Sequence, residues 1–303
     1  MRYFAFLTML LSTSLAGSIA DAADPVTLKW KLKVGDTFYI ENVQKMKTTT
    51  KVMDNEVVQN ATQTAITQFS VTKVTPDGGA VLQQTVLNSS SKSDRAGSED
   101  TGVSELIKGV TFTITLNGKH EIVKFEGYDE FVKKVSGGKT AVETALRAII
   151  PEENLKKSYS ETFSQFPGKA VSTGEMWNRT FNQSMGPIGN MAVTAIYEYV
   201  GKATIDEKPV EHITYVAALK YSPPKAEVDS NLPFTITKGN FKSDAFSGTI
   251  HFDSESGRIV NSVMNMKFSG DMTFLMEGES REVSLKSEMT IESRVLDKNP
   301  LDE

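Results

Sequence analysis

The chain has 303 residues and no cysteine, and its 33 lysines and arginines against 38 aspartates and glutamates give a formal charge of −5. Proteins that bind nucleic acid usually carry a clear basic excess, so we expect no nucleic-acid partner. The absence of cysteine excludes disulfide bonds, thiolate zinc sites, cysteine nucleophiles and cysteine-linked lipid anchors. The length allows one large β domain or two smaller units.

Residues 1–22 have the composition of a secretory signal peptide. Arg2 supplies the positive charge, an apolar run follows from Tyr3 to Leu11, and Ala20-Asp21-Ala22 has the small residues that signal peptidase recognises. The apolar run is about half of the ~20 residues that a membrane-spanning helix needs. We therefore predict cleavage near Ala22, no transmembrane segment, and a soluble extracytoplasmic product that is periplasmic or secreted.

Apolar residues alternate with polar ones along much of the remaining chain, which predicts half-buried antiparallel strands. One such stretch covers residues 28–34, and the longest ones cover 246–252, 264–276 and 283–291. Together they predict a mainly β fold. The pattern leaves open a closed barrel, a half-barrel and a sandwich.

Turn residues predict how these strands pair. A four-residue loop over 277–280 would pair residue 274 with 283 and would leave a notch where Gly270 faces Ser287. A three-residue loop over 255–257 would place Gly257 in a left-handed bulge and pair residue 252 with 260. Asn117-Gly118 is typical of a two-residue hairpin turn, and Asp77-Gly78-Gly79 of another turn. The polar stretch 89–100 predicts a flexible loop.

Residues 127–166 change to helical spacing, with apolar residues at Tyr128, Phe131 and Val132 and again from Val142 to Ile149. Gly137-Gly138 ends the first of three expected helices, and Pro151 begins the third. The predicted organisation is a signal peptide over 1–22, a first β-rich repeat over 23–126, a helical connector over 127–166, and a second β-rich repeat over 167–303. The fold is thus expected to consist of two similar antiparallel halves joined by short helices.

The two halves share short motifs at nearly constant spacing. Val34-Gly35-Asp36-Thr37-Phe38 is echoed by Thr173-Gly174-Glu175-Met176-Trp177, and Thr113-Ile114 by Thr249-Ile250. Convergence on similar hairpin turns is the alternative explanation. Because the order, spacing and turn residues agree together, we favour an internal duplication.

Three stretches of the chain resemble a family of secreted bacterial proteins that is known only as a domain of unknown function. They are Leu28–Asp36, Phe112–Gly118 with its continuation to Phe131, and Phe166–Trp177. The resemblance covers nearly the whole mature chain but implies no activity and no catalytic residues. It implies a β-rich, two-copy layout distantly similar to the lipoprotein-carrier half-barrels, in which a curved antiparallel sheet holds acyl chains against helices.

Catalytic and cofactor motifs are nearly absent, so we expect no enzyme, no cofactor and no metal site. The chain has no nucleophile elbow, dinucleotide-binding glycine motif or zinc-protease motif. Its histidines, His120, His212 and His251, lie far apart in the sequence, and we expect them to face solvent. A glycosidase-type acid pair stays open because its two carboxylates need not be neighbours in the chain.

The remaining candidate site is an apolar strand face rich in methionine. Methionine is flexible and polarisable, so it adapts to varied apolar partners. A packed core beneath the sheet is the main alternative, and copper(I) held by thioethers is a further one. We call these side chains the methionine face: Met264, Met266, Phe268, Met272, Phe274, Met276 and Met289.

These observations predict an exported, non-catalytic binding or carrier protein for a lipid, another apolar ligand or an envelope component. In that hypothesis the helical block covers the methionine face and moves aside to admit the ligand. The competing hypothesis is a structural or interaction protein of the cell envelope with a fully packed interior. A carrier needs a cavity of several hundred cubic ångströms, whereas a packed scaffold needs none.

Overall fold

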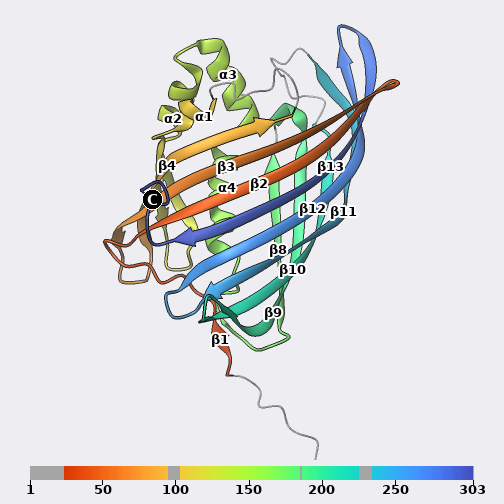
Figure 1. Cartoon of the computed structure of the whole chain (residues 1–303). Helices are drawn as coiled ribbons and strands as arrows, with labels where there is room; N and C mark the ends of the chain where they lie inside the picture. Colours follow the sequence, from red (N-terminus) through yellow and green to blue (C-terminus); the bar gives the residue numbers. More distant parts are fainter. Residues whose placement is uncertain (1–23, 95–102, 185, 225–233, 303) are drawn as a thin grey trace, which may run out of the picture.

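The computed structural model (Figure 1) describes residues 24–94, 103–184, 186–224 and 234–302. The predicted signal peptide lies outside these residues, as does the 95–100 half of the 89–100 segment. The elements of the first part of the chain are β1 (Val26–Thr27), β2 (Thr37–Val52), β3 (Asn55–Val74), β4 (Ala80–Ser93), α1 (Val103–Ile107), β5 (Thr111–Leu116), β6 (Ile122–Glu126), α2 (Tyr128–Ser136), α3 (Thr140–Ile149) and α4 (Glu152–Ser164). Those of the second part are β7 (Ala170–Val171), β8 (Met176–Ser184), the 3₁₀ turn η1 (Gly186–Ile188), β9 (Asn190–Ile205), β10 (Lys208–Ser222), β11 (Thr235–Asp253), β12 (Arg258–Met276) and β13 (Glu279–Leu296).

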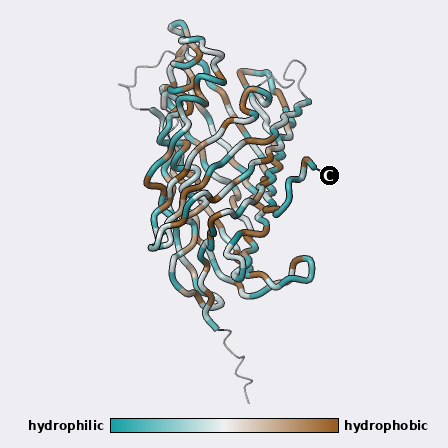
Figure 2. The backbone as a smooth tube through the Cα atoms, turned by 90° about the vertical axis from the view of Figure 1, so that its left-hand side faces the viewer, coloured by the Kyte–Doolittle hydropathy of each residue, from teal (hydrophilic) through white to brown (hydrophobic). Residues whose placement is uncertain are grey.

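In the described ranges, eleven strands form one antiparallel sheet in the order β6-β5-β4-β3-β2-β13-β12-β11-β10-β9-β8. The long strands curve around the molecule (Figure 1), and hydrophobic and hydrophilic residues alternate along them (Figure 2). Within the described residues the end strands β6 and β8 do not pair, so the sheet stays open. The predicted mainly β, antiparallel fold is confirmed. β1 and β7 form a separate two-stranded ladder.

The three predicted helices of the connector are confirmed, and their ends follow from the sequence. Gly137 adopts the left-handed conformation after α2, where its amide caps carbonyl groups of the last turn. Pro151 immediately precedes α4, whose first turn carries Glu152 and Glu153. α4 packs on both end strands, β6 and β8, so it lies at the opening of the sheet. No helix in the described ranges has the length and apolar character that crossing a bilayer requires.

Among the residues that the structure describes, one hydrophobic core joins the sheet to α2 and α4. Phe163 of α4 contacts the rings of Trp30 and Phe69, with centroid distances of 5.3 and 6.3 Å. Tyr128 and Val132 of α2 belong to the same buried cluster. Strands of both predicted repeats contribute to this core.

The segment 28–34 is not a sheet strand, which corrects the prediction. Only Val26–Thr27 forms a ladder there, with Ala170–Val171. Leu28 and Trp30 are nevertheless buried, while Val34 is exposed. The alternation therefore identified a chain segment that crosses the core without continuous strand pairing.

The β12–β13 hairpin differs from the prediction by two residues. Its turn is the two-residue Glu277-Gly278, both with positive φ, as a type I′ turn requires. Gly270 therefore faces Leu285 and not Ser287. No notch is open there, because Phe241 of β11 packs against Gly270.

Two further turns and the predicted loop over 89–100 differ in part from their predictions. Gly257 is left-handed as expected and the pairing Gly248–Met264 fits the predicted register, but a bulge at the turn pairs Phe252 with Ile259. The Asn117-Gly118 turn is longer than two residues, because the Asn117 side chain accepts hydrogen bonds from the amides of residues 119 and 121. β4 continues to Ser93, so the 89–93 part of the predicted loop is a strand.

The turns that carry the proposed repeat have matching hydrogen bonds. Gly35 donates to Val71, and Gly174 donates to Tyr199; both glycines have positive φ. In each turn the following acidic side chain, Asp36 or Glu175, accepts from a backbone amide three residues earlier. Both turns therefore start a long strand in the same way, while the duplication and its boundaries stay predictions.

Replacing Gly270 by alanine is expected to lower the free energy of unfolding by about 1–2 kcal/mol. A Cβ atom there would overlap the backbone oxygen of Asn240 and lie 2.7 Å from the Cα atom of Phe241. Urea denaturation of the variant measures the loss. Thr273→Ala on the same strand is the control, and equal stability of the two variants would contradict the close packing.

Candidate functional site

The methionine face lies on the sheet face that also forms the core. Strand alternation places Met264 on the same face as its neighbour Ile250, which is buried. Further along β12 the face leaves the core and its side chains become half-exposed. All seven residues predicted for this site are half-buried and lie outside the buried core cluster.

Neighbouring strands extend the methionine face with residues that sequence analysis did not assign to the site. Met46 of β2 pairs with Met289, which pairs with Met266, which pairs with Phe246 of β11. The three methionines help to line a depression of about 350 Å³, whose other lining residues are mostly polar ones at the alternating strand positions. The residues next to Met46 on the same strand face are mostly polar, so the sequence pattern of β2 did not indicate that Met46 belongs to the site.

In the part of the chain that the structure describes, the helices do not cover the methionine face, which corrects the expected arrangement. Their main contacts with the sheet are those of α1 with β4 and of α4 with β6 and β8. β12 and β13 lie in the middle of the sheet order. Their hairpin end lies at the upper right of Figure 1, away from α1, α2 and α3. Opening a helical lid is therefore not needed to reach these side chains.

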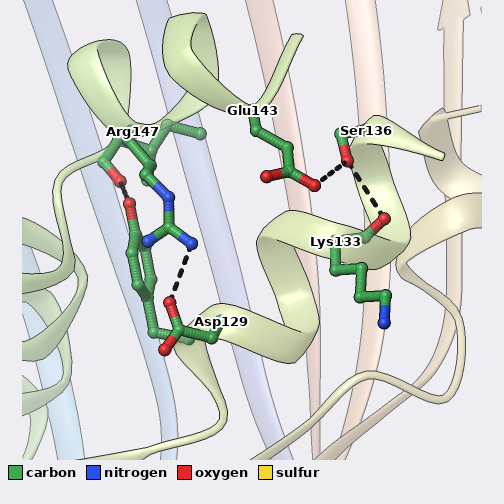
Figure 3. A network of polar contacts seen from close by, with 7 residues as sticks. Asp129, Lys133, Ser136, Glu143 and Arg147 are labelled. Carbon is green, nitrogen blue, oxygen red and sulfur yellow. Dashed lines mark hydrogen bonds and ion pairs between the residues drawn. The ribbon is translucent and has the colours of Figure 1, made fainter. Parts of the chain in front are cut away.

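α2 and α3 are joined into one hairpin by polar contacts (Figure 3). The Arg147 guanidinium of α3 donates to the Asp129 carboxylate of α2 at 2.8 Å and lies over the Tyr128 ring. At the other end of the pair, the Ser136 hydroxyl donates to the Glu143 carboxylate at 3.3 Å. These contacts hold the two helices as a unit.

A second hollow, a cleft of about 810 Å³, lies at the opening of the sheet. It is lined by four separate parts of the chain: residues 28–30, the turn 118–121, residues 157–168 of α4 and its continuation, and residues 179–182 of β8. Its floor includes the core residue Phe163. Arg179 of β8 donates to the backbone oxygens of Ser164 and Phe166, which fixes the end of α4 against β8.

Two titratable groups of this cleft are shifted by burial. Burial raises the pKa of the Glu161 carboxyl to about 7. Burial and the nearby Lys29 ammonium hold the pKa of His120 below its usual value. His120 is buried and adopts a positive φ of 60°, which is unusual for a residue other than glycine. The expectation that His120 faces solvent is therefore wrong.

The other two histidines meet on adjacent strands, which their distance in the sequence did not predict. His212 Nδ1 lies 2.8 Å from His251 Nε2, and His251 Nδ1 lies 2.7 Å from Asn261 Oδ1. Because the Asn261 oxygen only accepts, His251 donates from Nδ1 and accepts at Nε2 from His212. Within the described residues no three His, Cys, Asp or Glu side chains are placed to hold a metal ion.

We expect acid to weaken the fold through the histidine pair. Burial and the neighbouring His251 lower the pKa of His212, so the unfolded chain binds a proton more readily. Stability from this pair is therefore present above pH ~6.5 and is lost as the pH falls below it. Urea denaturation between pH 5 and 8 should show a smaller acid loss for His212→Gln than for the wild type. Identical pH profiles would contradict the assignment.

Comparison with known proteins relates part of the chain to a family but to no activity. Residues 68–206 match the family described as "Family of unknown function (DUF6263)". The resemblance to a family of unknown function is thereby confirmed. No curated protein matches the chain.

The solved structures that are similar to this chain are distant. The COG4313 outer membrane channel from Pseudomonas putida F1 has 10% identity and a TM-score of 0.19, covering 91% of this chain and 99% of its own. OpdL and OccK7 (OpdD) from Pseudomonas aeruginosa have 8% and 7% identity and TM-scores of 0.22 and 0.25. Each covers 86% of this chain and 99% of its own. TM-scores this low carry no argument about fold or function.

Proposed function

We propose that this protein is an exported, non-catalytic binding or carrier protein for an apolar ligand, held on the methionine face. The observation that carries the proposal is that this face continues the core face of the sheet but is only half-buried. An ordinary core would enclose these side chains. Leaving them partly in water costs free energy that an apolar ligand would recover, at roughly 25 cal/mol for each Å² of apolar surface buried.

The chemistry of the face favours a long apolar chain as the ligand. From Met264 to Met272 the strip is about 26 Å long, at ~3.3 Å per residue. Unbranched methionine side chains adjust to ligands without a fixed shape. The opposite face of β12 carries polar residues such as Asn265, Lys267 and Asp271, which keep that side in water. Export is supported by the signal-peptide composition of residues 1–22.

The alternative is a structural or interaction protein of the envelope with a fully packed interior. The depression of about 350 Å³ that Met266 and Met289 help to line and the cleft of about 810 Å³ both favour binding over this alternative. Pockets of 300–1,000 Å³ are typical of small-molecule sites.

Binding of an uncharged fluorescent probe, N-phenyl-1-naphthylamine, tests the proposal. The Met266→Gln/Met289→Gln double variant keeps side-chain size but removes apolar surface at the centre of the face. We expect its affinity for the probe to fall about tenfold, which corresponds to about 1.4 kcal/mol. Native mass spectrometry of the protein from its own envelope should show a bound apolar mass in the wild type and less of it in the double variant.

Leu275→Gln is the matched control, because Leu275 is exposed on the opposite face of β12. Its affinity for the probe should equal that of the wild type. If the wild type binds no probe and shows only the polypeptide mass, the carrier proposal is wrong. Equal losses in both variants would place the binding elsewhere.

A further inference from the structure

We propose that the cleft between α4 and β8 is a second site, for a small organic anion with an aromatic or aliphatic body. This inference does not rest on the proposed function, because the cleft lies at the opening of the sheet and the methionine face lies in its middle. The volume of about 810 Å³ suits a ligand of this size.

The cleft combines an apolar floor with a cationic border. Leu28, Trp30 and Phe163 of the buried core lie at its base, and the half-buried Pro167 and Phe181 add apolar surface that a ligand can reach. A ligand body would lie against these side chains. Four cationic side chains and only two carboxylates line the cleft, so the local charge favours an anion. The cations are Lys29, Lys119, Lys157 and Arg179, and the acids are Glu121 and Glu161.

The cations come from four different parts of the chain, which surrounds a ligand with positive charge. Exposed Lys119 comes from the β5–β6 turn and exposed Lys157 from α4. Arg179 is oriented by its two hydrogen bonds to the carbonyl groups of Ser164, at the end of α4, and Phe166. Glu121 is already bonded to the Asn117 side-chain amide at 2.8 Å. This leaves Glu161 as the carboxyl that decides how the site responds to pH.

Glu161 lines the same cleft and makes anion binding dependent on pH near neutrality. Burial raises the pKa of its carboxyl to about 7, so it is neutral below that pH and charged above it. A charged Glu161 repels an anionic ligand in this partly desolvated cleft. Burial, together with Glu161 itself, raises the pKa of Tyr197 on the adjacent strand β9 to about 12, so Tyr197 stays uncharged. The pKa of His120 is lowered, so this side chain is neutral at pH 7.

The test compares two probes that share one ring system. Anilinonaphthalene sulfonate carries a negative charge and N-phenyl-1-naphthylamine carries none. The chain has two tryptophans, so Trp177→Phe leaves Trp30, in the cleft, as the donor for energy transfer to the bound probe. We expect energy transfer from Trp30 to the anionic probe, and an affinity that falls about fivefold from pH 6 to pH 8.

Three variants of the full chain decide the assignment. The Lys119→Gln/Lys157→Gln double variant should bind the anionic probe with about tenfold lower affinity. Lys208→Gln, at the β9–β10 turn, should leave the affinity unchanged. Glu161→Gln should keep the affinity of pH 6 up to pH 8. The Met266→Gln/Met289→Gln variant, which tests the methionine face, should still bind the anionic probe with energy transfer from Trp30.

Several outcomes would overturn the second site. Equal affinity for the charged and uncharged probes with unchanged binding in the double lysine variant would remove the anion preference. If only the Met266→Gln/Met289→Gln variant fails to bind the anionic probe, the probe binds on the methionine face. If the affinity of the wild type for the anionic probe does not change between pH 6 and 8, Glu161 does not control anion binding. Circular dichroism of each variant confirms that it is folded.

Discussion

Replacing Phe163 by alanine is expected to lower the free energy of unfolding by about 3–5 kcal/mol, because a large buried ring would leave a cavity. Phe163 is only 3% exposed and contacts the rings of Trp30 and Phe69. It connects α4 to the first part of the sheet, while α4 also packs on β8. Urea denaturation followed by circular dichroism and by tryptophan fluorescence measures the loss.

The same experiment tests whether α4 and the sheet form one cooperative unit. If they do, both signals should change at one urea concentration in the wild type and in Phe163→Ala. Ile149→Ala on α3 is the control, because Ile149 is apolar but 42% exposed. We expect that variant to lose less than about 1 kcal/mol. A small loss in Phe163→Ala, or separate transitions for the helices, would contradict a shared core.

The ends of the helices were predicted more accurately than the register of the β12–β13 hairpin, for a physical reason. Gly137 and Pro151 mark helix ends through their backbone conformations, so the three helices of the connector were predicted. The β12–β13 register depends on whether Glu277 can adopt a positive φ beside Gly278. We predicted a four-residue loop in place of this two-residue turn, and the longer loop shifted the predicted β12–β13 pairing by two residues. Because side chains alternate with a period of two, this error left every residue on its predicted face.

The sequence predicted only those site residues that lie together on a single strand. β12 alone presents most of the methionine face, so its alternation identified those side chains. Met46 joins them through the pairing of β2 with β13, and nothing local in β2 indicates that contact. The cleft is assembled from four separate segments, and the burial that shifts the pKa of Glu161 exists only after they meet. Likewise, His212 and His251 meet only through the β10–β11 pairing.

A buried carboxylate provides the second prediction with a large effect. Glu211 of β10 is almost fully buried, and both of its oxygens accept hydrogen bonds. The Tyr199 hydroxyl donates to one at 2.5 Å, and the Ser254 hydroxyl donates to the other at 2.8 Å. The Lys31 ammonium donates to the Ser254 backbone oxygen at 2.9 Å, which brings a positive charge near the pair. Burial and the Glu211 carboxylate raise the pKa of Tyr199, so its hydroxyl keeps the donated proton.

Tyr199→Phe is therefore expected to lower the free energy of unfolding by about 1.5–3 kcal/mol, because a buried charge loses one of its two hydroxyl donors. Urea denaturation at pH 7 measures the loss, with Tyr39→Phe on β2 as the matched control, expected to change stability by less than about 0.5 kcal/mol. Adding Glu211→Gln should recover part of the loss, since a neutral amide is less costly to leave with one donor. If the double variant is as unstable as the sum of the single ones, the hydroxyl and the carboxylate act independently.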